Sequence, residues 1–225
     1  MQSLKNRLLN EDFYTNATST VAHPSTREEL INEIKTRLAE RQTDLNDIDT
    51  SRITDMSELF SDINLPIGNI DISGWDVSNV TDMSNMFGWC NRFNSDLSKW
   101  DVSNVKDMRG MFYRCKKFNS DLSNWNVSNV KNMRDMFREC TLFRSDLSKW
   151  DVSNVADMGF MFQNCYAFNS DLSKWDVSSV KDMNGMFLGC KKFNSDLSGW
   201  DVSNVKNTYI MFDGTSVELP SWYSD

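Results

Sequence analysis

Residues 101–125 read Asp101-Val-Ser-Asn-Val-Lys-Asp-Met-Arg-Gly-Met-Phe-Tyr-Arg-Cys-Lys-Lys-Phe-Asn-Ser-Asp-Leu-Ser-Asn-Trp125, and close copies of this stretch follow one another without a gap. The copies place a tryptophan at every 25th residue, at Trp75, Trp100, Trp125, Trp150, Trp175 and Trp200. A fixed period of this size is typical of repeat architectures, in which each unit buries its apolar face only by stacking on its neighbours. The repeat therefore predicts one continuous core.

Composition excludes several classes of partner. The chain has 225 residues and a formal net charge of −8, whereas nucleic acid demands a basic face. No stretch reaches the roughly 20 apolar residues that span a bilayer, so we expect no membrane insertion. The first ten residues lack the apolar core of a signal peptide and a lipidation cysteine. Either the protein is cytoplasmic or a targeting segment lies outside this chain.

The five cysteines, Cys90, Cys115, Cys140, Cys165 and Cys190, keep the same step as the tryptophans. An odd number of identically placed cysteines does not suit a disulfide framework and instead predicts buried free thiols in a structural position. Zinc sites require closely spaced Cys and His residues, which this sequence does not have. We expect no metal and no cofactor.

Four regions follow from the pattern. Residues 1–24 have no clear period and predict a loosely ordered segment. Residues 25–47 predict a capping region whose amphipathic helix spans about 25 to 42, with Ser25 as N-cap and Glu28 completing a capping box. The repeats occupy residues 48–213, as one atypical unit and six 25-residue units of which the last is degraded, and residues 214–225 predict a C-terminal cap.

Within one unit two periods alternate. Trp125 and Val127 flank Asn126, which predicts a short strand. Val105, Met108, Met111, Phe112 and Cys115 then lie on one face of a short helix. Because strands pack more closely than helices, stacking such units predicts a curved α/β solenoid with strands on the concave side and helices on the convex side. We expect a right-handed, leucine-rich-repeat-like superhelix.

The order Leu-x-x-Trp-x-Val-x-x-Val-x-x-Met-x-x-Met-Phe-x-x-Cys-x-x-Phe resembles the BspA-like leucine-rich repeats of bacterial surface proteins. Its Trp-Asp-Val-Ser-Asn-Val-x-Asp-Met-x-x-Met-Phe core is similar to the repeat of listerial and mycoplasma surface lipoproteins. The resemblance covers residues 48 to about 213. It implies display at the cell surface or secretion, binding to host proteins or cells, and no enzymatic activity. The chain departs from the family by lacking a lipoprotein signal and a cell-wall anchor.

A catalytic site would need a local exception to the repeat, and the sequence offers weak candidates. His23, the only histidine, lies outside the repeats beside Pro24. Aspartates recur in nearly every unit, as in some polysaccharide lyases and calcium-binding solenoids, but a catalytic centre should be confined to one or two units. We therefore interpret them as groups that hydrogen-bond the backbone of their own turns.

A partner should be recognised where the copies differ on the outside. On the expected concave face the candidates form a stripe of mixed charge: Lys99, Asp101, Asn124, Asn126, Lys149, Asp151, Lys174 and Asp176. On the expected helix face the candidates are arginines and aromatic residues, the types enriched in binding hot spots: Trp89, Arg109, Tyr113, Arg114, Arg134, Arg138 and Phe160. For each set the competing explanation is ordinary solvated surface.

Three functions remain open. The first is a non-enzymatic bacterial adhesion or binding module, monomeric, that recognises a protein or glycan on another cell surface. The second is a passive structural spacer or assembly unit without a specific partner. The third is a solenoid carbohydrate-active enzyme that uses one or two aspartates. Saturable binding to host surface molecules separates the first from the second, and cleavage of acidic polysaccharides identifies the third.

Overall fold

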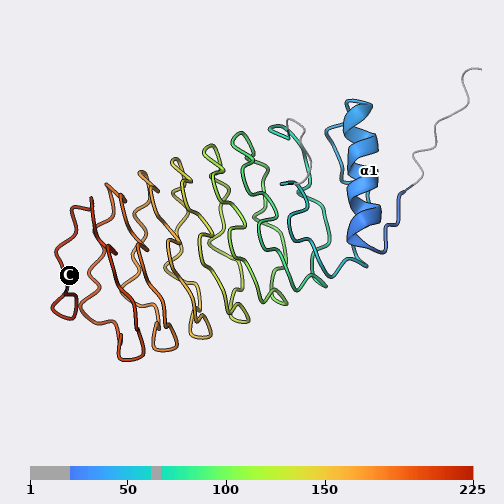
Figure 1. Cartoon of the computed structure of the whole chain (residues 1–225). Helices are drawn as coiled ribbons and strands as arrows, with labels where there is room; N and C mark the ends of the chain where they lie inside the picture. The colour runs from blue at the N-terminus through green and yellow to red at the C-terminus, as the bar shows by residue number, and fades with distance from the viewer. Residues whose placement is uncertain (1–20, 62–66, 225) are drawn as a thin grey trace, which may run out of the picture.

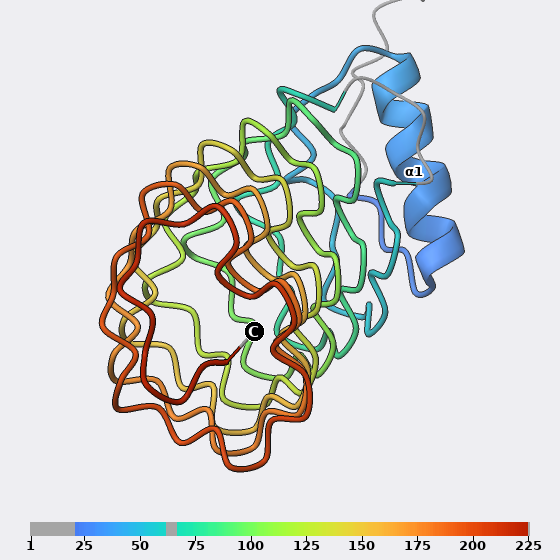
Figure 2. The same ribbon diagram turned by 60° about the vertical axis from the view of Figure 1, so that its left-hand side comes forward.

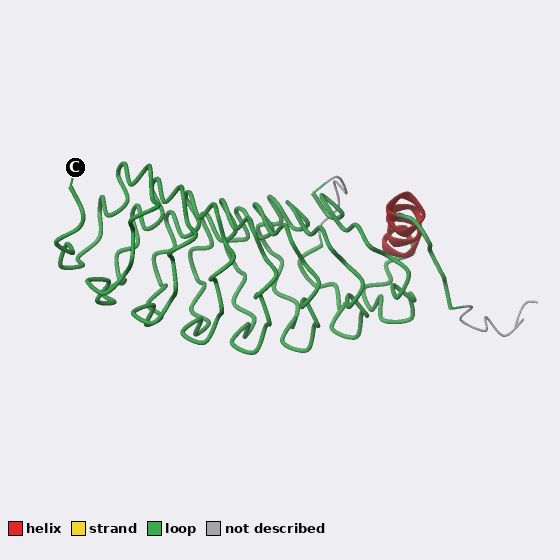
Figure 3. Cartoon of the chain, turned by 90° about the horizontal axis from the view of Figure 1, so that it is seen from below, coloured by secondary structure: helices red, strands yellow, loops and turns green. Residues whose placement is uncertain are grey.

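The computed structural model describes residues 21–61 and 67–224, in which the only α-helix is α1 (Arg27–Ala39) (Figure 1). A stack of coils follows, each lying beside the preceding one, and Figure 2 shows the coils obliquely as similar loops that follow one another from the C-terminal end toward α1. The stack bends into a gentle arc (Figure 3). No helix within the described part is long and apolar enough to cross a membrane.

α1 lies at the N-terminal end of the stack, as Figure 1 shows, and buries Leu30, Ile31 and Ile34. Its N-cap is Thr26 and not Ser25, because the Thr26 side chain accepts a hydrogen bond from the Glu29 amide at 3.2 Å. The Glu29 carboxylate in turn accepts from the Ser25 amide at 2.7 Å, so the predicted capping box is displaced by one residue. The helix also ends before residue 42, since Arg41 takes a φ of +62° that an α-helix does not accommodate.

Residues 21–24, expected to be loosely ordered, pair with the beginning of the stack. The Ala22 carbonyl accepts from the Asp49 amide at 2.9 Å, and His23 Nδ1 lies 2.8 Å from the Asp49 carboxylate. The remainder of that predicted segment, residues 1–20, lies outside the described part of the chain.

The first coil begins earlier than residue 48. Asp44 forms a parallel bridge with Asp71, and the Leu45 carbonyl accepts from Trp75 Nε1 at 2.9 Å. The Leu97 carbonyl receives the same bond from Trp125 Nε1 at 3.0 Å. Residues that the sequence assigned to the helical cap therefore already have the backbone contacts of a repeat.

The predicted strand and helix of each coil are wrong for the described repeats, which contain turns and isolated bridges. Four-residue turns follow one another: the amides of Trp125, Val130 and Met136 donate to the carbonyls of Leu122, Val127 and Met133 at 3.1, 2.9 and 3.1 Å. A turn closed by a bond between residues three apart returns side chains to the same side almost as a helix does. The methionine positions are therefore buried as expected, although no helix carries them.

Main-chain hydrogen bonds join neighbouring coils along one side, here called the turn face (residues 106–115 and their equivalents). The amides of four alternate residues donate to the next coil: Met108, Gly110, Phe112 and Arg114 bond the carbonyls of Asn132, Arg134, Met136 and Arg138 at 3.0, 2.8, 2.9 and 2.8 Å. Gly110 and Arg114 have φ of +61° and +63°, values outside any helix or strand.

The concave side was predicted from the closer packing of strands compared with helices. Because the described coils contain no helix, that difference in spacing no longer indicates which side is concave. The right-handed superhelix and the leucine-rich-repeat relation stay predictions.

Side chains join the coils elsewhere around the ring. The Ser145 hydroxyl accepts from the Leu122 amide at 2.8 Å, Asn129 Nδ2 donates to the Ser103 carbonyl at 2.7 Å, and Cys115 Sγ donates to the Phe87 carbonyl at 3.0 Å. Buried backbone groups that no sheet satisfies thus find a side-chain partner in every coil. This need explains why Ser, Asn, Cys and Trp recur at fixed positions.

The core consists of aromatic columns that run along the stack. Trp125 is 4% exposed and stacks on Trp150 at 6.5 Å between ring centroids, and Phe112 stacks on Phe137 at 5.6 Å. The segment predicted as a C-terminal cap extends the tryptophan column, because Trp222 stacks on Trp200 at 6.4 Å and its Nε1 donates to the Leu197 carbonyl at 2.9 Å.

Candidate functional site

The eight residues predicted on the concave face form what we call the tryptophan-side stripe. All eight are exposed, and they flank the buried tryptophan of each coil: Lys99, Asp101, Asn124, Asn126, Lys149, Asp151, Lys174 and Asp176. Its aspartates close their own turns, since the Asp101 carboxylate accepts from the Ser103 amide at 3.0 Å. The hydroxyl and amide of Ser103 lower the pKa of Asp101.

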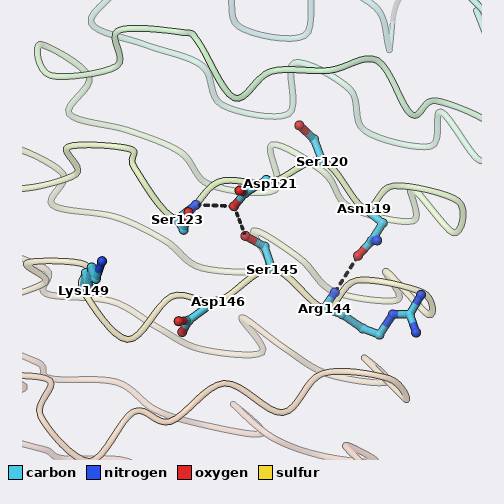
Figure 4. A pocket seen from close by; sticks show the side chains of 8 residues that line it. All are labelled: Asn119, Ser120, Asp121, Ser123, Arg144, Ser145, Asp146 and Lys149. Carbon is cyan, nitrogen blue, oxygen red and sulfur yellow. Dashed lines mark hydrogen bonds between the residues drawn. The ribbon is translucent and has the colours of Figure 1, made fainter.

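Beside this stripe lies a shallow pocket of about 400 Å³, shown in Figure 4, to which Lys149 contributes. Arg144 and Lys149 lie at its two ends, and the carboxylates of Asp121 and Asp146 lie between them. The Asp121 carboxylate accepts from the Ser123 amide at 3.0 Å, which lowers the pKa of Asp121. A similar pocket lies at Asp171 and Asp196. Because the acids hydrogen-bond within their own turns and the pocket recurs, we attribute it to the shape of the repeat and not to a specific site.

The residues predicted on the helix face gather more closely than the sequence indicated. The main-chain hydrogen bonds of the turn face, here called the backbone ladder, hold equivalent residues of adjacent coils side by side. The Trp89 amide, for example, donates to the Tyr113 carbonyl at 2.7 Å. The Trp89 and Tyr113 rings consequently meet edge to face, with 5.4 Å between centroids. The Arg114 guanidinium lies 4.1 Å from the Trp89 ring centroid and 5.3 Å from that of Tyr113, within the range of cation–π attraction.

The same ladder continues the contacts into the following coils. Arg138 lies between two rings, 5.4 Å from the Tyr113 centroid and 5.1 Å from the Phe160 centroid. Arg134 lies 5.4 Å from the Phe160 centroid. We call this set the arginine–aromatic cluster: Trp89, Tyr113, Arg114, Arg134, Arg138 and Phe160. Arg109, the seventh predicted residue, has an exposed side chain, and in the described part of the chain it makes no ring contact with the cluster.

Acidic residues that the sequence reading missed hold the arginines in place. Glu139 lies 3.1 Å from Arg114, Asp135 lies 3.0 Å from Arg138, and Arg134 lies 3.3 Å from Asp182 and 3.7 Å from Asp157. Burial raises the pKa of Asp157, and the Gly159 amide and Arg134 oppose this shift. The sequence does distinguish these two acids from the repeat, because Asp135 and Glu139 occupy the positions that Gly110 and Arg114 hold one unit earlier.

The cysteines are free, as predicted, and all except the partly buried Cys90 are buried. Burial raises the pKa of the Cys190 thiol to about 12 and that of Cys90 to about 12, so these thiols are neutral and unreactive at physiological pH. Within residues 21–61 and 67–224, no group of three His, Cys, Asp or Glu side chains is placed to hold a metal ion.

A comparison with protein families identifies the repeat. No curated protein and no solved structure matches the chain. One family model matches residues 29–147 and again residues 121–221, which together cover most of the sequence. The chain belongs to the family described as "Mycoplasma protein of unknown function, DUF285".

Proposed function

We propose that this chain is a non-enzymatic binding module, displayed at a bacterial surface, that recognises a protein on another cell through the arginine–aromatic cluster. The single observation that carries the proposal is the gathering of repeat-breaking residues. Trp89, Tyr113, Arg138 and Phe160 stand at positions that other units fill with different residue types, yet they form one continuous set of contacts. Solvated surface residues without a role would be scattered.

The cluster has the properties of a binding hot spot. Trp89 is 57% exposed, and the side chains of Arg114, Arg134 and Arg138 are about one third exposed, at 33%, 32% and 31%. Trp, Tyr and Arg carry a large share of binding energy at protein interfaces. The carboxylates of Asp135 and Glu139 fix the arginines before a partner arrives, which reduces the entropy lost on binding.

Backbone conformation gives independent support. Trp89, Arg114 and Phe160 take φ of +67°, +63° and +57°, in the left-handed region where bulky residues are uncommon. Each such residue costs of order 1 to 3 kcal/mol, and residues of this kind concentrate at functional sites. Gly110 and Gly185 occupy the Phe160 position in other units without that cost. Positive φ recurs at these positions along the stack, and what distinguishes Trp89 and Phe160 is an aromatic side chain where several other units place Gly or Asn.

The family resemblance supports the location and the class of function. The Trp-Asp-Val-Ser-Asn-Val core resembles the repeat of listerial and mycoplasma surface lipoproteins, and this resemblance implies a surface location and binding to host proteins or cells. The net charge of −8 disfavours nucleic acid as a partner. A glycan could occupy the tryptophan-side stripe instead, but the polar groups there recur in almost every coil and select no particular place along the stack.

The test is a binding screen against host extracellular proteins and glycans, followed by variants of each surface. For a saturable protein hit, Trp89→Ala or Arg114→Ala should weaken binding by about 2 kcal/mol, roughly thirtyfold. Tyr166→Ala is the matched control, because Tyr166 is 41% exposed and makes a similar contact with Lys191 outside the cluster. The control should bind like the parent chain.

Two results would overturn the proposal. A screen without any saturable hit would favour a passive spacer. Binding that survives both cluster variants but disappears when Asn124, Asn126, Lys149 and Asp151 are changed together would move the site to the tryptophan-side stripe. Circular dichroism of each variant separates loss of binding from loss of fold.

A further inference from the structure

Positive charge concentrates at one end of the arginine–aromatic cluster. Residues 106–117, in the coil that supplies Tyr113 and Arg114, include five basic residues and one acidic residue, although the whole chain carries a net charge of −8. The coil that supplies Phe160 has one acidic residue and no basic residue at the equivalent positions, 156–167. The two ends of the cluster therefore differ in charge.

The cations at the Tyr113 end lack acidic partners. Within the cluster itself the arginines are paired, since Arg114 lies 3.1 Å from Glu139 and Arg138 lies 3.0 Å from Asp135. Four exposed cations of the Tyr113 coil form no ion pair with any residue that the structure describes, and we call them the basic rim: Lys106, Arg109, Lys116 and Lys117.

The one carboxylate near the basic rim in sequence is engaged with other groups. Asp107 accepts hydrogen bonds from the Arg109 amide at 2.8 Å and from Asn132 Nδ2 at 3.4 Å. The positive charge of the rim is thus not compensated within its own coil. Uncompensated charge of one sign attracts a partner of the opposite sign and orients it during the encounter.

Building on the function proposed above, we infer that the partner reaches the cluster with an acidic polypeptide segment that carries an apolar residue among its carboxylates. The basic rim attracts the carboxylates of this segment. Trp89, which is 57% exposed, offers its ring to the apolar residue. The Phe160 end of the cluster, which adds no cation of its own, receives a less charged part of the partner.

A long, regular polyanion such as a sulfated glycan or a nucleic acid fits this arrangement less well. Its charge repeats along the polymer, so strong binding needs cations in successive coils. Lys116 and Lys117 are followed one coil later by Thr141 and Leu142, and the coil of Phe160 has no basic residue at the equivalent positions. A short acidic segment needs the cations of one coil only.

The experiment titrates a fluorescently labelled peptide, Glu-Glu-Glu-Leu-Glu-Glu-Glu, with the whole chain and follows fluorescence anisotropy. The control peptide has glutamine in place of every glutamate. The test variant combines Lys106→Gln, Lys116→Gln and Lys117→Gln. Its matched control changes the equivalent residues three coils later, Lys181, Lys191 and Lys192, to Gln, which removes the same charge from a coil that supplies no residue of the cluster.

The glutamate peptide should bind the parent chain saturably and more weakly as salt is added. The test variant should weaken this binding by about tenfold, and the matched control should stay within about twofold of the parent. Trp89→Ala should weaken binding about fivefold, and this effect should disappear for a peptide with glycine in place of leucine.

Five outcomes overturn the inference: equal binding of the glutamate and glutamine peptides, no binding of either, equal losses in the two lysine variants, tighter binding of a sulfated oligosaccharide, or tighter binding of vesicles of phosphatidylserine and phosphatidylcholine. The proposed function fails separately. A screen without a saturable protein hit contradicts that function, whereas a hit that needs Trp89 and Arg114 but not the three lysines contradicts this inference alone.

Discussion

At the scale of single residues, two positions in every coil decide how the backbone of the turn face runs. The first holds Glu58, Asn85, Gly110, Asp135, Phe160, Gly185 and Ile210, and all seven have positive φ. Gly, Asn and Asp are the types that tolerate this region, so four of the seven copies agree with the conformation. This agreement is a local signal for the turns that a search for helical periodicity overlooks.

Replacing Gly110 with alanine should lower the free energy of unfolding by about 1 to 2 kcal/mol. Gly110 has a φ of +61°, and an added Cβ would lie 2.2 Å from Asn85 Oδ1. The matched control is Gly199→Ala, because nothing lies within 4 Å of a Cβ added there, and this change should stay within about 0.5 kcal/mol of the parent. Urea denaturation of both variants measures the difference, and equal losses would show that the backbone at Gly110 is not constrained.

At the scale of the element, the sequence identifies the buried positions but not the backbone that carries them. Met108, Met111, Phe112 and Cys115 are buried as the helical spacing predicted. A helix and a series of four-residue turns both return side chains to one side at intervals of three or four residues, so spacing alone does not distinguish them. The arginine–aromatic cluster was found from residue type, whereas the acids that hold it required knowledge of which coils lie side by side.

Removing one ring from an aromatic column should strongly lower the free energy of unfolding. Trp125→Ala or Phe137→Ala should each reduce the free energy of unfolding by roughly 3 to 5 kcal/mol, because the two side chains are 4% and 0% exposed. Trp125 stacks on Trp150, and Phe137 stacks on Phe112 and Phe162. Chemical denaturation followed by circular dichroism measures this. A loss below about 1 kcal/mol would show that these positions are not core.

Trp125→Phe isolates the hydrogen bond from the packing. The indole Nε1 of Trp125 donates to the buried Leu97 carbonyl at 3.0 Å, and phenylalanine keeps a ring but leaves that carbonyl without its donor. We expect a loss of about 1 to 3 kcal/mol, smaller than that of Trp125→Ala. Equal losses in the two variants would contradict the packing contribution.

At the scale of the whole molecule, two ladders of ionisable groups set the pH range of stability. The amides and hydroxyls of their turns lower the pKa of aspartates along the stack, among them Asp96, Asp121 and Asp146, whereas burial raises the pKa of thiols such as Cys140. A carboxyl whose pKa is lowered by folding stabilises the folded chain above its unfolded pKa of about 3.9. A thiol whose pKa is raised stabilises it below the unfolded pKa of about 8.5.

The urea midpoint should therefore be nearly constant from about pH 5 to 8 and fall on both sides. On the acid side the unfolded chain takes up protons first, so stability is lost as the pH falls through the lowered aspartate values. On the alkaline side the unfolded thiols ionise first, so stability declines above about pH 8.5. Cys140→Ala should be less stable at every pH and decline less steeply on the alkaline side, with an unchanged acid side. A midpoint that stays constant down to pH 3 would show that the aspartate turns do not stabilise the stack.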